Sequence, residues 1–145
     1  MLKRLVRNLV KKHGMKGLLI KIGDWAVSSS KNSERVCEEM GSKYAKKEAV
    51  DLVLATGIIE SRYEYIKQLN SGPAASFHQV EPATAVDYCQ HFLSHRKSLM
   101  QKCAKAGMVD IKHWQNFDEK IWEEILEKNI AAGIVHCRLK YWRVP

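Results

Sequence analysis

A carboxylic acid at the end of an apolar segment is the first feature of this sequence that could do chemistry. Glu60 follows the apolar residues 53–59, in which only Thr56 and Gly57 interrupt the run, and Ser61 comes directly after it. Partial burial disfavours the charged form of a carboxyl group, raises its pKa and keeps some of it protonated near neutrality. Glu60 is therefore a candidate general acid. The alternative is a solvated glutamate at a helix end.

Histidines and cysteines offer a second kind of chemistry. His91 and His95 stand four residues apart, and Cys89 and Cys103 lie near them in sequence. Such spacing can bind zinc, but no acidic residue stands between the histidines as in His-Glu-x-x-His, and no motif supports a Cys–His nucleophile. We expect helix-surface or packing roles for these side chains, and neither a metal nor a cofactor.

Four short motifs follow one another in an informative order. They are Glu60-Ser61, Gly72-Pro73-Ala74, Phe77-His78-Gln79 and Glu81-Pro82-Ala83-Thr84. In this order they resemble the lysozyme-like lytic transglycosylases, in particular the virion-associated forms of tailed bacteriophages. That family has a helix ending in Glu-Ser, then a Gly-Leu-Met-Gln type motif, then Pro-Ala-Thr. The segment 137–143 also resembles the late helix of the phage proteins, and the resemblance covers about residues 45–145.

The resemblance implies a reaction and a set of site residues. One glutamate, here Glu60, protonates the leaving oxygen of a MurNAc–GlcNAc β-1,4 bond. It then takes the proton of the sugar's own C6 hydroxyl, which closes onto C1 and leaves a 1,6-anhydro end. The resemblance also implies substrate contacts from residues around the motifs: Ser61, Tyr63, Phe77, Gln79 and Glu81. In this reading Ser61 orients Glu60, the rings of Tyr63 and Phe77 stack on sugars, and Gln79 forms a hydrogen bond with the substrate.

Two features leave alternatives open. A second carboxylate, Glu64 or Glu81, would suit a hydrolytic lysozyme, because most glycosidases pair two carboxylates. The family glycine before Leu-Met-Gln is Ser76 here, and glycine adopts dihedrals and close approaches that other residues disfavour. Ser76 thus favours a catalytically weak or inactive structural protein on the same scaffold.

The elements that must position these residues are mostly helical. Apolar periodicity predicts helices over 15–27, 34–40, 44–60, 85–93, 94–106 and 118–142, with Ser33 and Thr84 as N-caps and Gly107 as a helix end. Residues 61–83 predict a short hairpin or irregular lobe, and 108–116 a connector. The expected fold is mainly α, in the α+β lysozyme-like class. Residues 1–32 form an N-terminal extension, Ser28–Ser33 a linker, and 33–145 the transglycosylase domain.

The N-terminus and the charge bear on partners. Apolar residues between Leu2 and Val10 recur at helical spacing beside five basic residues, and the formal net charge is +8. We expect this basic helix to dock on its own domain or a neighbouring subunit, with an anionic membrane as the alternative. Lys16, Lys21 and Asp24 interrupt any signal-peptide run, and no segment reaches the length of a membrane span.

The remaining expectations concern thiols, tryptophans and setting. We expect the four widely spaced cysteines to be reduced, and Trp114, Trp122 and Trp142 to be core or interface residues rather than a carbohydrate groove. The resemblance implies a virion (tail or internal) protein made in the host cytoplasm and acting at the host cell wall for genome entry. Its partners are peptidoglycan strands, other virion proteins in a homo- or hetero-oligomeric assembly, and peripherally DNA or anionic membrane. The basic charge alone also suggests a nucleic-acid-binding helical module, although no RNA- or DNA-binding motif is present.

Overall fold

The protein is built from helices throughout the part that its computed structural model describes, which is residues 4, 8, 11, 24–61 and 74–143. The longer helices are α2 (Asp24–Met40), α3 (Lys47–Ser61), α4 (Pro82–His91), α5 (Lys97–Ala106), α6 (Ile111–Gln115), α7 (Glu119–Lys128) and α8 (Ile130–Arg143). Two 3₁₀ turns, η1 (Ser42–Tyr44) and η3 (Leu93–His95), join them. Within these ranges the β structure consists of one isolated bridge between Ala75 and Val80. The predicted mainly α class is confirmed.

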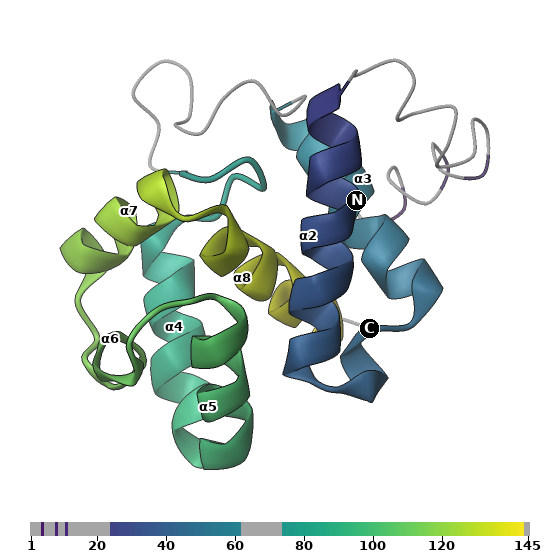
Figure 1. Ribbon diagram of the computed structural model, residues 1–145. Coiled ribbons are helices and arrows are strands. Elements are labelled where there is room, and N and C mark those ends of the chain that lie inside the picture. The colour runs from purple at the N-terminus through teal and green to yellow at the C-terminus, as the bar shows by residue number, and fades with distance from the viewer. Residues whose placement is uncertain (1–3, 5–7, 9–10, 12–23, 62–73, 144–145) are drawn as a thin grey trace.

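Helix α8 lies at the centre of the molecule. It packs against α2 and α3 on one side and against α4, α5 and α7 on the other (Figure 1). Every residue from Ala131 to Leu139 is buried. A helix buried all round needs small residues where neighbours come close, and Ala131, Ala132 and Gly133 supply them at its start.

Helix α3 holds Glu60 in its last turn. Residues 52–57 are buried, and Ile59 packs partly buried against the core. The apolar run predicted this helix correctly, together with its end beside Glu60. Its start lies three residues later than predicted, because the chain first forms η1 after Gly41, whose φ of 129° ends α2.

The predicted linker Ser28–Ser33 was wrong. All six residues lie inside α2, and so does the predicted boundary between residues 32 and 33. Ser33 is fully buried and shares one helix face with Val36, Cys37 and Met40. Packing of this face against α5, α8 and α3 outweighs the weak helix preference of the serines. Ser33 is thus an interior residue of the helix and no N-cap.

The predicted long helix 118–142 is two helices. Asn129 takes an extended conformation between α7 and α8, with φ −132° and ψ 101°. Its Oδ1 accepts a hydrogen bond from the Ala132 amide at 3.1 Å, and its Nδ2 donates to the Gly107 carbonyl at 2.8 Å. Asn129 thus caps the start of α8 and binds the distant Gly107, and these side-chain hydrogen bonds stabilise the break between the two helices.

Smaller boundaries also differ. Helix α4 begins at Pro82, with Glu81 in the N-cap position, so Thr84 lies in the first turn and is no cap. Proline suits the first helical position because its missing N–H would have no partner there. The predicted connector 108–116 contains α6, capped by Asp110 through its bond to the Lys112 amide. Gly107 does end α5 as predicted.

Most of the predicted N-terminal helices lie outside the described residues. Arg4, Asn8 and Lys11 are helical and exposed, and from the predicted helix 15–27 only the end, residues 24–27, is described, as part of α2. No helix in the described ranges has the length and hydropathy needed to cross a membrane.

The cysteines and two of the tryptophans belong to the core. All four thiols are free and buried, and burial raises the pKa of Cys37 to about 11 and of Cys89, Cys103 and Cys137 to about 12. Such thiols stay protonated and poorly nucleophilic. Trp114 and Trp122 are fully buried, whereas Trp142 is 41% exposed.

Candidate active site

Glu60 is half-buried in the last turn of α3. Burial raises the pKa of its carboxyl group, and the ammonium of Lys140 on α8 opposes that rise. Its environment therefore favours the protonated acid more than water does, as predicted from the apolar residues before it. A cation close enough to act on the carboxylate also stabilises the charge that appears once the proton has left.

The end of α8 is tied to α3 one turn before Glu60. The Thr56 hydroxyl donates to the Leu52 carbonyl at 2.7 Å, and Thr56 Oγ1 lies 2.6 Å from the Tyr141 hydroxyl. Since the one hydroxyl proton of Thr56 goes to Leu52, Tyr141 donates to Thr56. Burial raises the pKa of Tyr141, with Cys137 and Glu60 adding to the rise. These contacts fix the backbone that carries Glu60 against the C-terminal half of α8.

The third motif, Phe77-His78-Gln79, belongs to a tight turn. Ala75 and Val80 exchange two backbone hydrogen bonds of 2.9 and 2.7 Å, and the Gln79 amide donates to the Ser76 carbonyl at 3.1 Å. The side-chain amide of Gln79 donates to the same carbonyl at 2.9 Å. Ser76 and Gln79 have φ values of 65° and 50°, in the left-handed region that glycine favours.

Ser76 faces the protein interior. Its side chain is fully buried, and its Oγ accepts a hydrogen bond from the His78 amide at 3.1 Å. A Cβ built on Gly133 of α8 would come within 2.5 Å of that Oγ and 2.6 Å of the Ser76 Cβ. The backbone of Ser76 is left-handed, with a φ of 65°. The Ser76 hydroxymethyl group packs on α8.

His78 links the turn to the helix of Glu60. Its side chain is 4% exposed, and burial lowers its pKa to about 4, a shift that the nearby backbone of Val53 on α3 opposes. The position that a Cβ on Gly133 would take is 3.9 Å from its Nδ1. The turn thus lies against α3, which carries Glu60, and α8, which carries Lys140.

The other predicted site residues lie in different settings. Phe77 is buried, with 8% exposure, and Gln79 is half-buried. Glu81 is exposed at the start of α4, and Ser61 is the last residue of α3. Tyr63 and Glu64 lie outside the described residues. The structure brings Glu60 and the Ser76–Gln79 turn onto the same pair of helices, and the substrate roles of these residues stay predictions.

Sequence reasoning assigned no role to Thr56, Lys140 or Tyr141. Thr56 stands one helical turn before Glu60, which places the two on one face and is a usable signal. Lys140 and Tyr141 are about eighty residues away in sequence. The only signal for them was the resemblance of segment 137–143 to the late helix of the phage proteins, which gave a helix and no roles.

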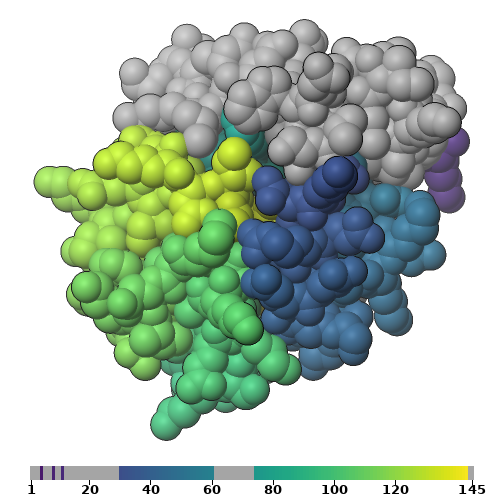
Figure 2. All heavy atoms as spheres, viewed as in Figure 1, coloured from purple at the N-terminus to yellow at the C-terminus, as the bar shows by residue number. Residues whose placement is uncertain are grey.

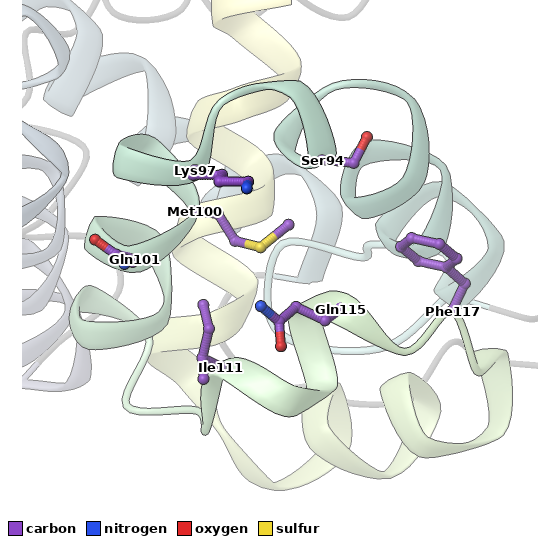
Figure 3. Close-up of a pocket in the computed structure, with 7 residues that line it drawn as sticks. All are labelled: Ser94, Lys97, Met100, Gln101, Ile111, Gln115 and Phe117. Carbon is purple, nitrogen blue, oxygen red and sulfur yellow. The ribbon is translucent and has the colours of Figure 1, made fainter.

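Hollows also lie away from Glu60, and one of about 700 Å³ along α6 and α7 includes Asp110, His113 and Glu124 in its lining. Figure 3 shows a cavity of about 310 Å³ at the start of α5, lined by Ser94, Lys97, Met100, Gln101, Ile111, Gln115 and Phe117. This set includes no histidine, cysteine or carboxylate. Throughout the described ranges, no three such residues gather to hold a metal ion, and His91 and His95 are both exposed.

Comparison of the chain with protein-family models, with curated proteins and with solved structures found no match in any of the three.

Proposed function

We propose that this protein is a peptidoglycan lytic transglycosylase of the lysozyme-like α+β class, carried in a bacteriophage virion. One observation carries the proposal. Glu60 lies in the last turn of α3, is half-buried with a raised pKa, and α3 is one of the two helices against which the Ser76–Gln79 turn lies. A proton donor on one of the two helices that hold this turn, in the family's motif order, suits cleavage of a glycan strand.

Glu60 acts twice in the proposed reaction. As an acid it gives its proton to the glycosidic oxygen while the bond from C1 of MurNAc to that oxygen breaks and an oxocarbenium-like centre develops. As a carboxylate it then takes the proton of the MurNAc C6 hydroxyl while that oxygen bonds to C1. The products are a free GlcNAc 4-hydroxyl and a 1,6-anhydro-MurNAc end, and the enzyme returns to its protonated state without consuming water.

Neighbouring residues prepare Glu60 for both steps. Burial at the end of α3 favours the acid before cleavage, and Lys140 stabilises the carboxylate afterwards. The Tyr141–Thr56 hydrogen bond keeps the last turn of α3 in place against α8. Preorganised surroundings of this kind lower the cost of moving the proton because little has to rearrange.

The inactive-scaffold alternative loses part of its basis. It rested on Ser76 in place of the family glycine, and the Ser76 side chain is buried where a Cβ on Gly133 would meet it. The hydrolase alternative rests on Glu81, which is exposed at the start of α4, and on Glu64, outside the described residues. The reaction product separates hydrolase from transglycosylase.

Delivery by a virion belongs to the proposal. In it, the basic N-terminal helix docks the enzyme on other tail or internal proteins of an oligomeric particle, and peptidoglycan strands are the substrate met at the host wall during genome entry. The exposed Arg4, Asn8 and Lys11 agree with a polar helix face.

The decisive experiment is product analysis. Purified full-length protein is incubated with isolated peptidoglycan, and the released fragments are identified by mass spectrometry. We expect 1,6-anhydro-muropeptides from the wild type, and a decrease of about 100-fold or more in Glu60→Gln, since general acid–base groups contribute 10²–10⁴ in rate. Glu48→Gln, an exposed residue at the start of the same helix, is the matched control and should retain activity.

The pH profile gives an independent check. Because Glu60 must begin protonated and its pKa is raised, the rate should fall as pH rises through that pKa. Reducing ends in place of anhydro ends would favour the hydrolase. No fragments at any concentration of folded protein would favour the scaffold.

A further inference from the structure

A basic recess lies where the end of α2, the η1 turn, the start of α5 and the end of α8 meet. It has a volume of about 440 Å³ and is lined by Met40, Lys43, Tyr44, Arg96, Lys97, Ser98, Leu99, Lys102 and Trp142. Helices α2 and α5, which bound it, lie side by side in Figures 1 and 2. Four of the lining residues are cations and none is acidic.

The cations of this recess are not neutralised within the described part of the chain. Lys43, Lys97 and Lys102 are exposed. Among the described residues, no carboxylate lies within ion-pair distance of these three lysines. Two other cations of the described residues do have carboxylate partners: Lys47 with Asp51 at 2.9 Å and Arg35 with Glu39 at 3.2 Å. Like charges gathered at one hollow raise its positive potential and favour an anionic ligand.

The start of α5 adds to that potential. Lys97, Ser98 and Leu99 form its first turn, and its N-cap residue Arg96 makes no side-chain capping bond. Amides in the first turn of a helix lack partners in the helix and carry partial positive charge, which suits a phosphate oxygen. The helix end reinforces the lysines and would not define a site without them.

An exposed aromatic ring at this recess indicates which class of anion it would bind. Trp142 is 41% exposed at the edge of the recess, with its ring centroid 4.7 Å from that of Tyr44. The Lys43 ammonium lies 5.2 Å from the Trp142 ring centroid. Positive side chains beside an exposed ring are the combination that binds single-stranded nucleic acid, with phosphates on the cations and a base on the ring. The volume also suits a ligand of nucleotide size.

We propose that this recess binds single-stranded nucleic acid, with the phosphates on Lys43, Lys97, Lys102 and the start of α5 and one base against Trp142. The site uses none of the residues placed around Glu60. This proposal therefore does not depend on whether the protein cleaves peptidoglycan.

The test compares two triple variants of equal charge. Binding of the full chain to a fluorescein-labelled oligothymidylate is followed by anisotropy at moderate salt. Lys43→Gln/Lys97→Gln/Lys102→Gln removes three charges from the recess. Lys105→Gln/Lys112→Gln/Lys128→Gln removes three exposed charges elsewhere. We expect the first to weaken binding about tenfold or more and the second by less than about threefold, since phosphate contacts dominate such affinity.

The role of the ring is tested separately. Trp142→Ala should weaken binding about fivefold or more, and Trp142→Phe should recover part of it, because stacking tolerates a change of ring. Inorganic polyphosphate with the same number of phosphates should compete poorly. Circular dichroism and thermal melting of each variant establish that it is folded.

Two results would overturn the proposal. Equal losses in the two triple variants would mean that binding follows net charge and has no site. Competition by polyphosphate as strong as by the oligonucleotide, with Trp142→Ala unchanged, would mean that the recess recognises a polyanion and no base.

Discussion

Ser76 has a left-handed backbone conformation although it is not a glycine. Its side chain packs against Gly133, the glycine of α8. A non-glycine residue in this region costs on the order of 1–2 kcal/mol. The bond from the His78 amide to Ser76 Oγ and the close fit on Gly133 offset part of that cost. Ser76 and Gly133 therefore form a matched pair in which each restricts the other.

This pair gives a prediction that requires two substitutions. Gly133→Ala should destabilise the protein by about 1–3 kcal/mol, the usual cost of overpacking, because the new methyl group would meet Ser76 at 2.5 Å. Ser76→Gly relieves the backbone conformation and removes the atoms in collision. The double variant Ser76→Gly/Gly133→Ala should thus recover most of the loss, as measured by urea unfolding.

Ser76→Ala is the control for that cycle. It keeps the Cβ that a Gly133→Ala methyl group would meet at 2.6 Å, so Ser76→Ala/Gly133→Ala should stay destabilised. Equal rescue by alanine and glycine would show that Oγ alone causes the conflict. No rescue by either would mean that α8 itself does not tolerate the methyl group.

At the scale of elements, the junction of α7 and α8 depends on one asparagine. Asn129 caps α8 through Oδ1 and holds Gly107 through Nδ2. Asn129→Ala loses both interactions and should cost about 1–3 kcal/mol of unfolding free energy, measured by urea titration. Asn129→Asp keeps the capping oxygen and loses the donor, so its cost should be smaller. Equal costs for the two variants would contradict the capping role.

Helix interiors could be predicted from sequence better than helix ends. The apolar run of α3 and the stop at Gly107 are local signals, and both predictions were correct. The break at Asn129 depends on a bond to Gly107, twenty-two residues away, and no local pattern reports such a bond. The serines of α2 misled for the opposite reason, because a buried face containing Ser33 overrides a local preference for turns.

The candidate site was predictable to a similar degree. Glu60 and the Ser76–Gln79 turn could be located because their motifs are contiguous in sequence. Lys140 and Tyr141 reach Glu60 only through the packing of α8 on α3, which the spacing of residues along the chain does not encode. The direction of the Ser76 side chain likewise depends on Gly133, a contact between distant segments.

At the scale of the whole molecule, the central helix brings a histidine into an aromatic cluster. His136 of α8 is 1% exposed, with its ring centroid 5.3 Å from Trp114, 4.7 Å from Trp122 and 6.0 Å from Tyr88. Within the described part of the chain, neither of its ring nitrogens has a hydrogen-bond partner. Burial lowers its pKa to about 3. The fold thus holds this histidine neutral, as it does His78, whose pKa is lowered to about 4.

Two such histidines make the fold sensitive to acid. Below the ordinary histidine pKa of 6.5 these two histidines bind protons in the unfolded chain but stay neutral in the folded chain. The stability present above pH 6.5 is therefore lost as pH falls toward the folded-state pKa values of about 4 and 3. Each histidine contributes a slope of up to about 1.4 kcal/mol per pH unit, or about 2 kcal/mol between pH 6.5 and 5.

Urea unfolding at a series of pH values measures this dependence of the unfolding free energy on pH. His136→Phe should reduce it by one proton, whereas His91→Phe, an exposed control, should leave it unchanged. A wild-type slope that persists in His136→Phe would place the acid sensitivity elsewhere in the molecule.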